Sequence, residues 1–371
     1  MEFTVNKADL VRELGLSQGV VEKKTTIPIL SNVLLEAGDG GLTLTATDLE
    51  LGIRSTCPAK VKTAGAGTIP AKRLLDYVRL LPDAEVTIKF MENQWANLTC
   101  GRSKTRIAGM SRESYPELPV TPEKIVDLPA SLLASMITRT IFAISNEESR
   151  FTLNGAQLIL KPDSLTMVAT DGHRLALVEE KTPLDSLTGV YKALLPKKAM
   201  TEILKLASDA GADAKIAFSG DDNHLFFQFG NRLLLSRKLS GNFPDYERVL
   251  PKEHAHSVNL AKDELKATIE RVAQFSDDRS RAIRLQVSPG EVKIYSSLSE
   301  TGESEESIPV DYAGPQVEIG FNASYMIEFL RALPTPEAKF LFKDGQSAGE
   351  MQPGEPSEKL TYRYVVMPMR I

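Results

Sequence analysis

The 371-residue sequence predicts an α+β fold made of three tandem copies of one unit. First, LTLTATDLELGI (42–53) is echoed by LTMVATDGHRLAL (165–177); both alternate apolar and polar residues, reach Thr-Asp and continue as a strand. Second, amphipathic helical segments recur at matching places. Self-similarity at a fixed spacing indicates one supersecondary unit used repeatedly.

Each copy is expected to begin with a helix and to carry a second helix in its middle. The opening helices are NKADLVREL, PASLLASMITRTIF and AKDELKATIERVAQF; the middle ones are PAKRLLDYVRLLP, PKKAMTEILKLAS and NASYMIEFLRALP. Their apolar residues recur at helical spacing. Asn6, Asn259 and Asn322 are expected N-caps, because an asparagine side chain can accept a hydrogen bond from the first helical turn.

Proline-rich linkers divide the copies. ELPVTPEKIVDLP follows the first copy and ERVLPKEHAHS follows the second. Strand, turn and strand patterns such as RFTLNGAQLILKPDS fill the rest of each copy as hairpins. We therefore expect domains at 1–120, 121–250 and 251–371, each with two helices and about eight short strands.

Bulk composition is that of a globular protein, with 42% apolar residues and a net charge of −5. No apolar run is long enough to span a bilayer, and the start MEFTVNKADL has no secretory leader, so we expect a cytoplasmic protein. Cys57 and Cys100 lack metal spacing and are expected to be reduced thiols. A mild acidic charge argues only weakly against nucleic acid, because positive charge can be segregated on one surface.

The stretch VATDGHRLAL (168–177) permits three interpretations. Asp171 and His173 could belong to a catalytic constellation, but no nucleophile motif such as G-x-S-x-G accompanies them. His173 could instead be a satisfied histidine at a strand end, with Asp171 and Gly172 forming a turn. The third interpretation is a docking site that joins this turn to distant segments.

The C-terminal segment YVVMPMRI favours the third interpretation. Terminal segments normally fray, so an apolar tail of this kind is expected to be docked or bound. Its methionines suit a surface that accepts several partners, because their flexible side chains can re-pack.

IPILSN, TDLEL, LNG, ATDGHRLA, FPDYERVLP, IGFN and YVVMPMR occur in an order and spacing that resemble the bacterial sliding clamp, the beta subunit of DNA polymerase III. The resemblance covers the whole chain. It implies a head-to-tail dimer that closes into a ring, with sheets outside and helices lining the hole. It also implies a non-enzymatic processivity factor that encircles duplex DNA and tethers the replicative polymerase, the clamp loader and other proteins through short apolar peptides.

The resemblance implies a pocket for these peptides, with His173 and Arg174 as rim groups and Asp171 as a turn residue. The implied pocket residues are Leu153, Thr170, Gly172, His173, Arg174, Leu175, Pro244, Arg248, Val249, Tyr325, Val365, Val366, Met367, Pro368, Met369 and Arg370.

Basic residues are the candidates for DNA contact, because phosphate contacts attract DNA without reading its sequence. Lys72, Arg73, Arg79, Lys197, Lys198 and Lys205 lie on the polar faces of the middle helices. Taken alone they could be a solvated face, since acids are interspersed. The resemblance adds Lys24 and Arg150, although Glu147 and Glu148 beside Arg150 would repel phosphate.

A head-to-tail contact needs two different complementary surfaces on one chain. The first copy offers a basic edge strand with Arg102, Lys104 and Arg106, and the third offers an acidic loop with Glu300, Glu303, Glu305 and Glu306. Ile107 and Phe275 resemble the apolar part of such an interface.

The runner-up function is a repeat-built scaffold that binds proteins and never encloses DNA. A hydrolase built on Asp171 and His173 is the third possibility. We expect no cofactor and no metal, since no histidine or cysteine cluster accompanies His173. No P-loop is present either, so loading onto DNA would need a separate ATPase.

Overall fold

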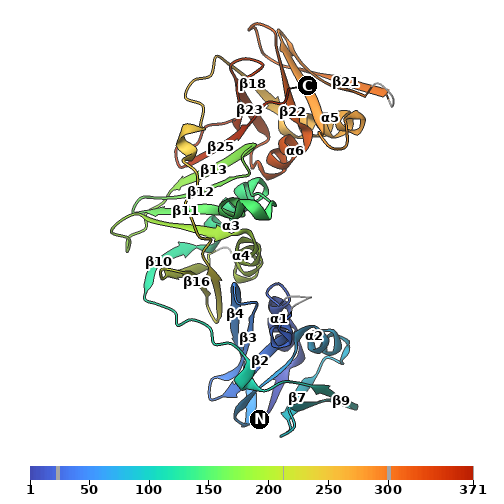
Figure 1. Cartoon of the computed structure of the whole chain (residues 1–371), viewed down its shortest axis with the longest axis vertical. Coiled ribbons are helices and arrows are strands. Elements are labelled where there is room, and N and C mark those ends of the chain that lie inside the picture. The colour runs from blue at the N-terminus through green and yellow to red at the C-terminus, as the bar shows by residue number, and fades with distance from the viewer. Residues whose placement is uncertain (22–25, 212, 299–301, 371) are drawn as a thin grey trace. The chain divides into compact units, whose positions relative to one another are not determined.

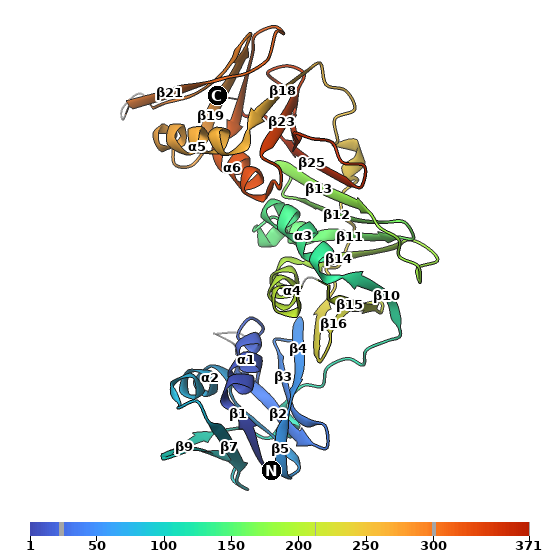
Figure 2. The same ribbon diagram turned by 180° about the vertical axis from the view of Figure 1, so that it is seen from behind.

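The computed structural model describes residues 1–21, 26–211, 213–298 and 302–370. Two compact units contain them, and each unit combines parts of more than one repeat. The N-terminal unit comprises Met1–Ser131 and Lys198–Lys238, and the C-terminal unit comprises Leu132–Lys197 and Leu239–Ile371. Figures 1 and 2 show the chain from opposite sides.

The described residues form six α-helices, and each repeat supplies two of them. They are α1 (Lys7–Ser17), α2 (Ala71–Leu80), α3 (Ala130–Thr140), α4 (Lys197–Ala210), α5 (Lys262–Val272) and α6 (Ala323–Ala332). Asn6 and Asn322 cap α1 and α6 as expected, by accepting backbone hydrogen bonds from Ala8 (2.8 Å) and Ser324 (2.9 Å). Asn259 was wrongly expected to be a cap.

Asn259 lies inside strand β18 (His256–Ala261), where it pairs with Lys339, and α5 begins three residues later. Ala261 occupies the N-cap position of α5 without a side-chain cap. The strand pairing therefore outweighs the capping preference of asparagine at this position.

The N-terminal unit contains two antiparallel sheets. The five-stranded sheet has the order β5 (Ala59–Thr63), β1 (Glu2–Asn6), β7 (Glu85–Phe90), β8 (Trp95–Cys100) and β9 (Ser103–Ala108). The eight-stranded sheet has the order β10 (Lys124–Pro129), β15 (Lys215–Gly220), β16 (His224–Phe229), β17 (Arg232–Arg237), β4 (Leu51–Cys57), β3 (Gly41–Thr47), β2 (Asn32–Gly38) and β6 (Gly65–Pro70). Pairing of β17 with β4 makes this sheet continuous between the second and first repeats.

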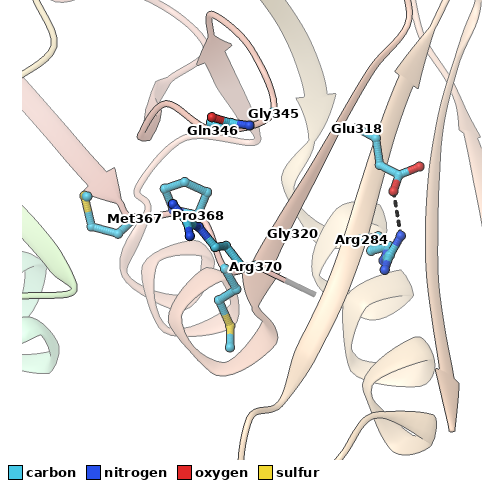
Figure 3. Close-up of a pocket in the computed structure, with 9 residues that line it drawn as sticks. Arg284, Glu318, Gly320, Gly345, Gln346, Met367, Pro368 and Arg370 are labelled. Atoms are coloured by element: carbon cyan, nitrogen blue, oxygen red, sulfur yellow. Dashed lines mark hydrogen bonds and ion pairs between the residues drawn. The ribbon is translucent and has the colours of Figure 1, made fainter.

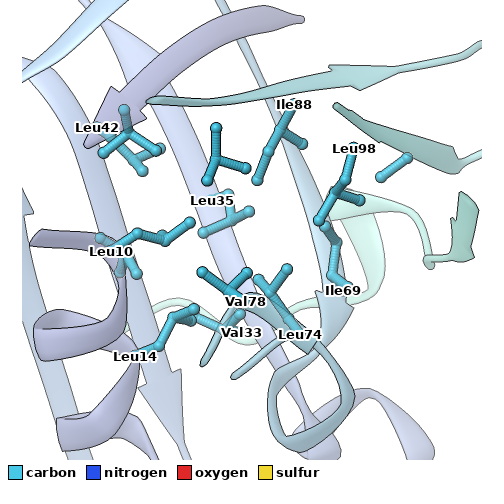
Figure 4. Close-up of a cluster of buried hydrophobic side chains, with 14 of the residues drawn as sticks. Leu10, Leu14, Val33, Leu35, Leu42, Ile69, Leu74, Val78, Ile88 and Leu98 are labelled. Atoms are coloured by element: carbon cyan, nitrogen blue, oxygen red, sulfur yellow. The ribbon is translucent and has the colours of Figure 1, made fainter. Parts of the chain in front are cut away.

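The core of the N-terminal unit lies between its helices and sheets, where α1 and α2 pack side by side (Figure 1). Leu14 of α1, Leu74 and Val78 of α2, and Leu35 of β2 are fully or almost fully buried in one cluster (Figure 4). The helical spacing of Leu74 and Val78 places both on one face. Truncating such a leucine to alanine typically costs about 2–5 kcal/mol.

The C-terminal unit also contains two antiparallel sheets. The eight-stranded sheet has the order β14 (Tyr191–Pro196), β11 (Gly155–Lys161), β12 (Ser164–Thr170), β13 (Arg174–Lys181), β25 (Leu360–Val366), β24 (Gly349–Pro353), β23 (Glu337–Phe342) and β18. The four-stranded sheet has the order β21 (Gly302–Pro309), β20 (Glu291–Leu298), β19 (Ala282–Ser288) and β22 (Val317–Asn322), with α5 and α6 packed together beside it (Figure 2). Pairing of β13 with β25 brings the C-terminal strand against the stretch that follows Gly172.

The predicted α+β fold with two helices per repeat is confirmed. In the described residues the first repeat has nine strands, β1–β9, and the others have eight each, β10–β17 and β18–β25. Cys57 and Cys100 are free and buried. Within the same ranges, no helix combines the length and apolar character that a bilayer crossing requires.

Candidate functional site

A tight turn connects β12 to β13 at residues 170–174, and its polar side chains hold it together. The Asp171 Oδ1 atom accepts hydrogen bonds from the backbone nitrogens of His173 (2.9 Å) and Arg174 (3.1 Å). Gly172 adopts a φ of +91°, which favours glycine, and donates its backbone N–H to Thr170 Oγ1 (3.1 Å). Asp171 is therefore a turn residue, as the resemblance implied.

Arg150 closes one side of this turn. Its guanidinium donates a hydrogen bond to the Asp171 carbonyl (2.9 Å) and forms an ion pair with Glu147 (2.9 Å). A Cβ atom added at Gly172 would lie 2.9 Å from Arg150 Nη1. The turn therefore favours glycine for its backbone conformation, while the flexible end of the Arg150 side chain could shift to admit a Cβ atom.

Arg174 is buried, so the expectation that it lies on the rim of the pocket is wrong. Its side chain is only 7% exposed; Nε bonds Asp171 Oδ2 (3.0 Å), Nη1 bonds Glu328 of α6, and Nη2 donates to the Phe142 carbonyl (2.6 Å). The guanidinium also lies over the Tyr325 ring, 4.2 Å from its centroid. Arg174 thus ties the turn to α6 from beneath.

Electrostatics keep Arg174 charged despite its burial. Burial alone would lower the pKa of the guanidinium, but the carboxylates of Glu328 and Asp171 outweigh this effect and raise the pKa above its ordinary value. The ring of Tyr364 is buried beside it, and burial raises the pKa of that phenol, so it stays neutral. The cluster is a structural network whose charges are compensated.

Asp171 and His173 do not form an acid–base pair. The backbone N–H of His173, rather than its ring, bonds Asp171, and the second carboxylate oxygen bonds Arg174. A general base needs an orienting partner on its ring, so this geometry does not support a triad. The described ranges also hold no group of three histidine, cysteine, aspartate or glutamate side chains placed to bind a metal ion.

An apolar floor lies on one face of the eight-stranded sheet beside the turn. Val168 of β12, Leu175 and Leu177 of β13, and Val365 of β25 form one buried cluster. Three side chains of the linker that follows residue 240 pack against this floor: Phe243, Tyr246 and Leu250. The floor therefore joins the turn, the linker and the C-terminal strand.

The C-terminal tail is docked, as its composition predicted. After β25, the backbone N–H of Met367 bonds the His173 carbonyl (2.9 Å), and that of Met369 bonds the Gly320 carbonyl of β22 (2.8 Å). Met367 remains 46% exposed, and Val249 in the linker is 48% exposed. Two exposed apolar side chains thus flank a floor that is otherwise buried.

The structure places the sixteen expected pocket residues in the C-terminal unit and divides them by exposure. Buried are Leu153, Thr170, Arg174, Leu175, Val365 and Val366; half-buried are Tyr325, Pro368 and Met369; exposed are Gly172, His173, Pro244, Arg248, Val249, Met367 and Arg370. The buried members can shape the site and only the others present a side chain to a partner. We call all sixteen residues together the docking site.

A polar cavity of about 590 Å³ lies beside the tail (Figure 3). The tail residues 367–370 form one wall, and Arg284 and Glu318, an ion pair at 2.8 Å, lie opposite with Gln346 nearby. Sequence reasoning missed Arg284 of β19 and Glu318 of β22, because alternating polar residues in these strands carry no signal beyond that of an ordinary strand.

The candidate DNA-contact residues are partly engaged within the fold. Ion pairs join Lys72 to Asp76 (2.7 Å), Lys205 to Glu202 (2.6 Å) and Lys198 to Asp48, and Lys197 donates to Asn146 (2.8 Å). Arg73 and Arg79 are exposed on α2. Lys24 lies outside the described residues. Only the Lys72–Asp76 pair is exposed on both sides and therefore weak, whereas the carboxylates of Asp48 and Glu202 are 5% exposed.

Both candidate interface segments are edge strands. β9 carries Arg102, Lys104 and Arg106 on or beside it and ends the five-stranded sheet, as expected. The acidic segment was expected to be a loop, but residues 302–309 form strand β21, the edge of the four-stranded sheet. β21 carries glutamates at 303, 305 and 306, and charged side chains are common on edge strands, which the loop prediction overlooked.

The side chains along these edges differ from the expectation in detail. Ile107 is only 5% exposed and belongs to the core, whereas Phe275 is 38% exposed. Glu305 pairs with Lys293 (2.7 Å) and Glu306 with Arg271 (2.6 Å). Glu303 is exposed, and Glu300 lies outside the described residues.

Three domain models of one family match the chain in order. The N-terminal domain of the DNA polymerase III beta subunit matches residues 1–119, the central domain 127–245 and the C-terminal domain 247–370. A beta sliding clamp from Caulobacter vibrioides is 35% identical, with each chain covered completely.

Solved structures agree with these matches. The DNA polymerase III subunit beta of Pseudomonas aeruginosa has a TM-score of 0.94 at 33% identity, and the same organism's sliding clamp bound to griselimycin has 0.92 at 32%; both comparisons cover each chain completely. Three clamp domains in this order define a non-catalytic accessory protein of DNA replication. The chain belongs to the sliding clamp family, the beta subunits of bacterial DNA polymerase III.

Proposed function

We propose that the protein is a processivity factor: it encircles duplex DNA as a head-to-tail homodimer and tethers the replicative polymerase to it. The clamp loader and other replication or repair proteins use the same docking site. The observation that supports this most directly is the apolar floor, to which β25 contributes Val365, together with the tail docked beside it on the His173 carbonyl.

The docking site would take short apolar peptides of these partners. The floor residues bury apolar surface, while Met367 and Val249 offer exposed apolar side chains at its border. Methionine re-packs around different shapes at low cost, which suits several partners. His173 and Arg370 would contact the polar parts of a peptide, and Arg174 would hold the turn in position.

We infer that ring closure joins β9 of one protomer to β21 of its partner. Their free backbone edges can pair, and the basic residues of β9 complement Glu303 and its neighbours. The domain boundaries near 120 and 250, and DNA contact by Lys72, Arg73, Arg79, Lys197, Lys198, Lys205, Lys24 and Arg150, belong to the same proposal. So does a cytoplasmic location, where the bacterial chromosome is copied.

Truncation of the tail tests the docking site. Val365 and Val366 are strand residues buried in the sheet, so the deletion should remove only residues 367–371. We expect the truncated chain to dimerise normally and to lose processive synthesis with its polymerase on a primed single-stranded circle. Full processivity of the truncated chain would contradict the assignment.

A further inference from the structure

A buried carboxylate on β24 gathers three polar side chains. The Glu350 side chain has no exposed surface and accepts two hydrogen bonds from Arg363, at Nε–Oε1 2.6 Å and Nη2–Oε2 2.7 Å. Gln352 donates to Oε1 (2.6 Å), and the His254 ring nitrogen Nε2 lies 3.0 Å from Oε2. We call this group the Glu350 cluster.

The cluster adjoins the floor of the docking site on the same sheet face. Val365 lies opposite Leu175 on β13 and opposite Glu350 on β24, so these three side chains form one row across adjacent strands. Arg363 lies opposite Leu177, two residues before Val365, and therefore shares that face. The apolar floor passes directly into the charged cluster.

The cluster also holds the linker that borders the floor. Arg363 Nη2 donates to the Pro251 carbonyl (2.9 Å), and His254 contacts Glu350. Pro251 follows Leu250, which packs on the floor, and the exposed Val249 comes just before it. Residues 249–255 form no strand, so these two polar contacts fix where this part of the linker lies.

We propose that Glu350 and Arg363 are positioning residues of the docking site, which hold the linker at the spacing that an apolar peptide needs. A buried ion pair contributes little net stability compared with apolar residues of similar size, so stability alone does not explain the cluster. Its specific effect is geometric, because a planar guanidinium joins the carboxylate and the linker carbonyl at once. This inference rests on the proposed peptide-docking function.

A matched control exists in the N-terminal unit. Arg232 makes the same two-bond contact with Glu13, at Nε–Oε2 2.9 Å and Nη2–Oε1 2.8 Å, and Glu13 is likewise fully buried. The other partners of this pair are Asp209 and Arg12 rather than linker residues. Arg232→Met therefore breaks an equivalent buried pair without touching the docking site.

The test uses full-length Arg363→Met, Arg232→Met and the double variant Glu350→Met/Arg363→Met. The probe is a dye-labelled synthetic peptide with leucine and phenylalanine side chains. If the linker is correctly placed only a tenth of the time in Arg363→Met, affinity falls about tenfold through a slower association rate. Arg232→Met should bind like the wild type even if its melting temperature falls.

The double variant separates position from stability. Two methionines should restore much of the melting temperature, yet leave Pro251 and His254 without their partners, so peptide affinity should stay low. Amide hydrogen exchange over residues 246–254 should accelerate in both Arg363→Met and the double variant, and not in Arg232→Met.

Wild-type affinity in the double variant, or unchanged exchange over 246–254, would overturn the positioning role. If the wild type does not bind the peptide, the proposed docking function fails, and exchange over the linker still decides whether the cluster holds it.

Discussion

Arg174 shows how a residue can serve a docking site without being able to reach a ligand. Its guanidinium bonds Asp171, Glu328 and the Phe142 carbonyl, and only 7% of the side chain is exposed. Glu328 lies on α6, so one side chain ties the turn of the second repeat to a helix of the third. The shape of the turn therefore depends on burial and ion pairing beneath it.

Replacing Arg174 by alanine should destabilise the fold as well as the docking site. Removal leaves the largely buried Asp171 and the 39% exposed Glu328 without their partner. Breaking a fully buried ion pair typically costs about 3–5 kcal/mol, and solvent around Glu328 reduces the cost here. We expect a lower free energy of unfolding in denaturant titrations together with loss of peptide binding. Normal unfolding combined with weakened binding would instead mean that Arg174 contacts peptides directly.

Acid should weaken the fold partly through Glu350. Burial raises the pKa of this carboxyl, but hydrogen bonds from Arg363 and Gln352 outweigh burial and lower the pKa below its reference value of 4.5. Its contribution to stability is thus complete above the unfolded-state pKa and is lost as the pH falls through the lower folded-state value.

The variant Glu350→Gln lacks this titration. The acid limb of its unfolding free energy, measured by denaturant between roughly pH 3 and pH 7, should be less steep than that of the wild type. Identical slopes for the two proteins would show that folding does not lower the pKa of the Glu350 carboxyl.

The first and second repeats contain equivalent turns. A comparison of the two turns explains why only one junction between repeats carries the docking site. In the first repeat, Asp48 Oδ1 accepts backbone hydrogen bonds from Glu50 (2.9 Å) and Leu51 (2.6 Å), as Asp171 does in the second. Leu49 then stands where Gly172 stands, with a φ of +78°. The backbone design is shared, so the difference lies in the side chains.

The sheet face beside the first turn is not an apolar floor. Thr45, Gly52 and Arg54 replace Val168, Leu175 and Leu177 in the aligned strands. The linker side chain Leu118 packs there against Leu235, and a Cβ added at Gly52 would lie 3.0 Å from it. Linker side chains therefore cover both junctions. The second differs because its floor is apolar and because Val249 and Met367 expose apolar side chains at its border.

The two turn positions should respond in opposite directions to substitution. Leucine at positive φ costs about 1–2 kcal/mol, so Leu49→Gly should leave stability unchanged or raise it by up to about 1 kcal/mol after the entropy cost of glycine. Gly172→Ala places a Cβ atom at a φ of +91° and should destabilise by about 1 kcal/mol. Thermal melting of both variants checks this, and a stabilised Gly172→Ala would contradict it.

At the scale of the whole molecule, we expect the proposed ring to close through two edge strands rather than through surface charge. Exposed ion pairs contribute only about 0–1 kcal/mol each and are screened by salt, whereas backbone pairing and apolar burial at Phe275 are not. We expect the dimer to persist at a few hundred millimolar salt in sedimentation experiments. Dissociation into monomers under that condition would mean that charge holds the ring together.

Sequence reasoning reached the repeats, the docked tail and the turn because each leaves a local pattern. The Thr-Asp motif is visible in the first and second repeats, and an apolar tail is unusual enough to require a partner surface. Contacts distant in sequence left no such signal: Glu328 lies 154 residues from Arg174. The glutamates of β21 read as a loop because an acidic edge strand and a solvated turn have the same composition.

Retention on DNA tests the central claim most directly. Protein loaded by its clamp loader onto nicked circular DNA should remain bound during gel filtration and should be released when one cut linearises the circle. Retention that ignores the cut, or failure to remain on the intact circle, would contradict encirclement and leave a scaffold that binds proteins alone.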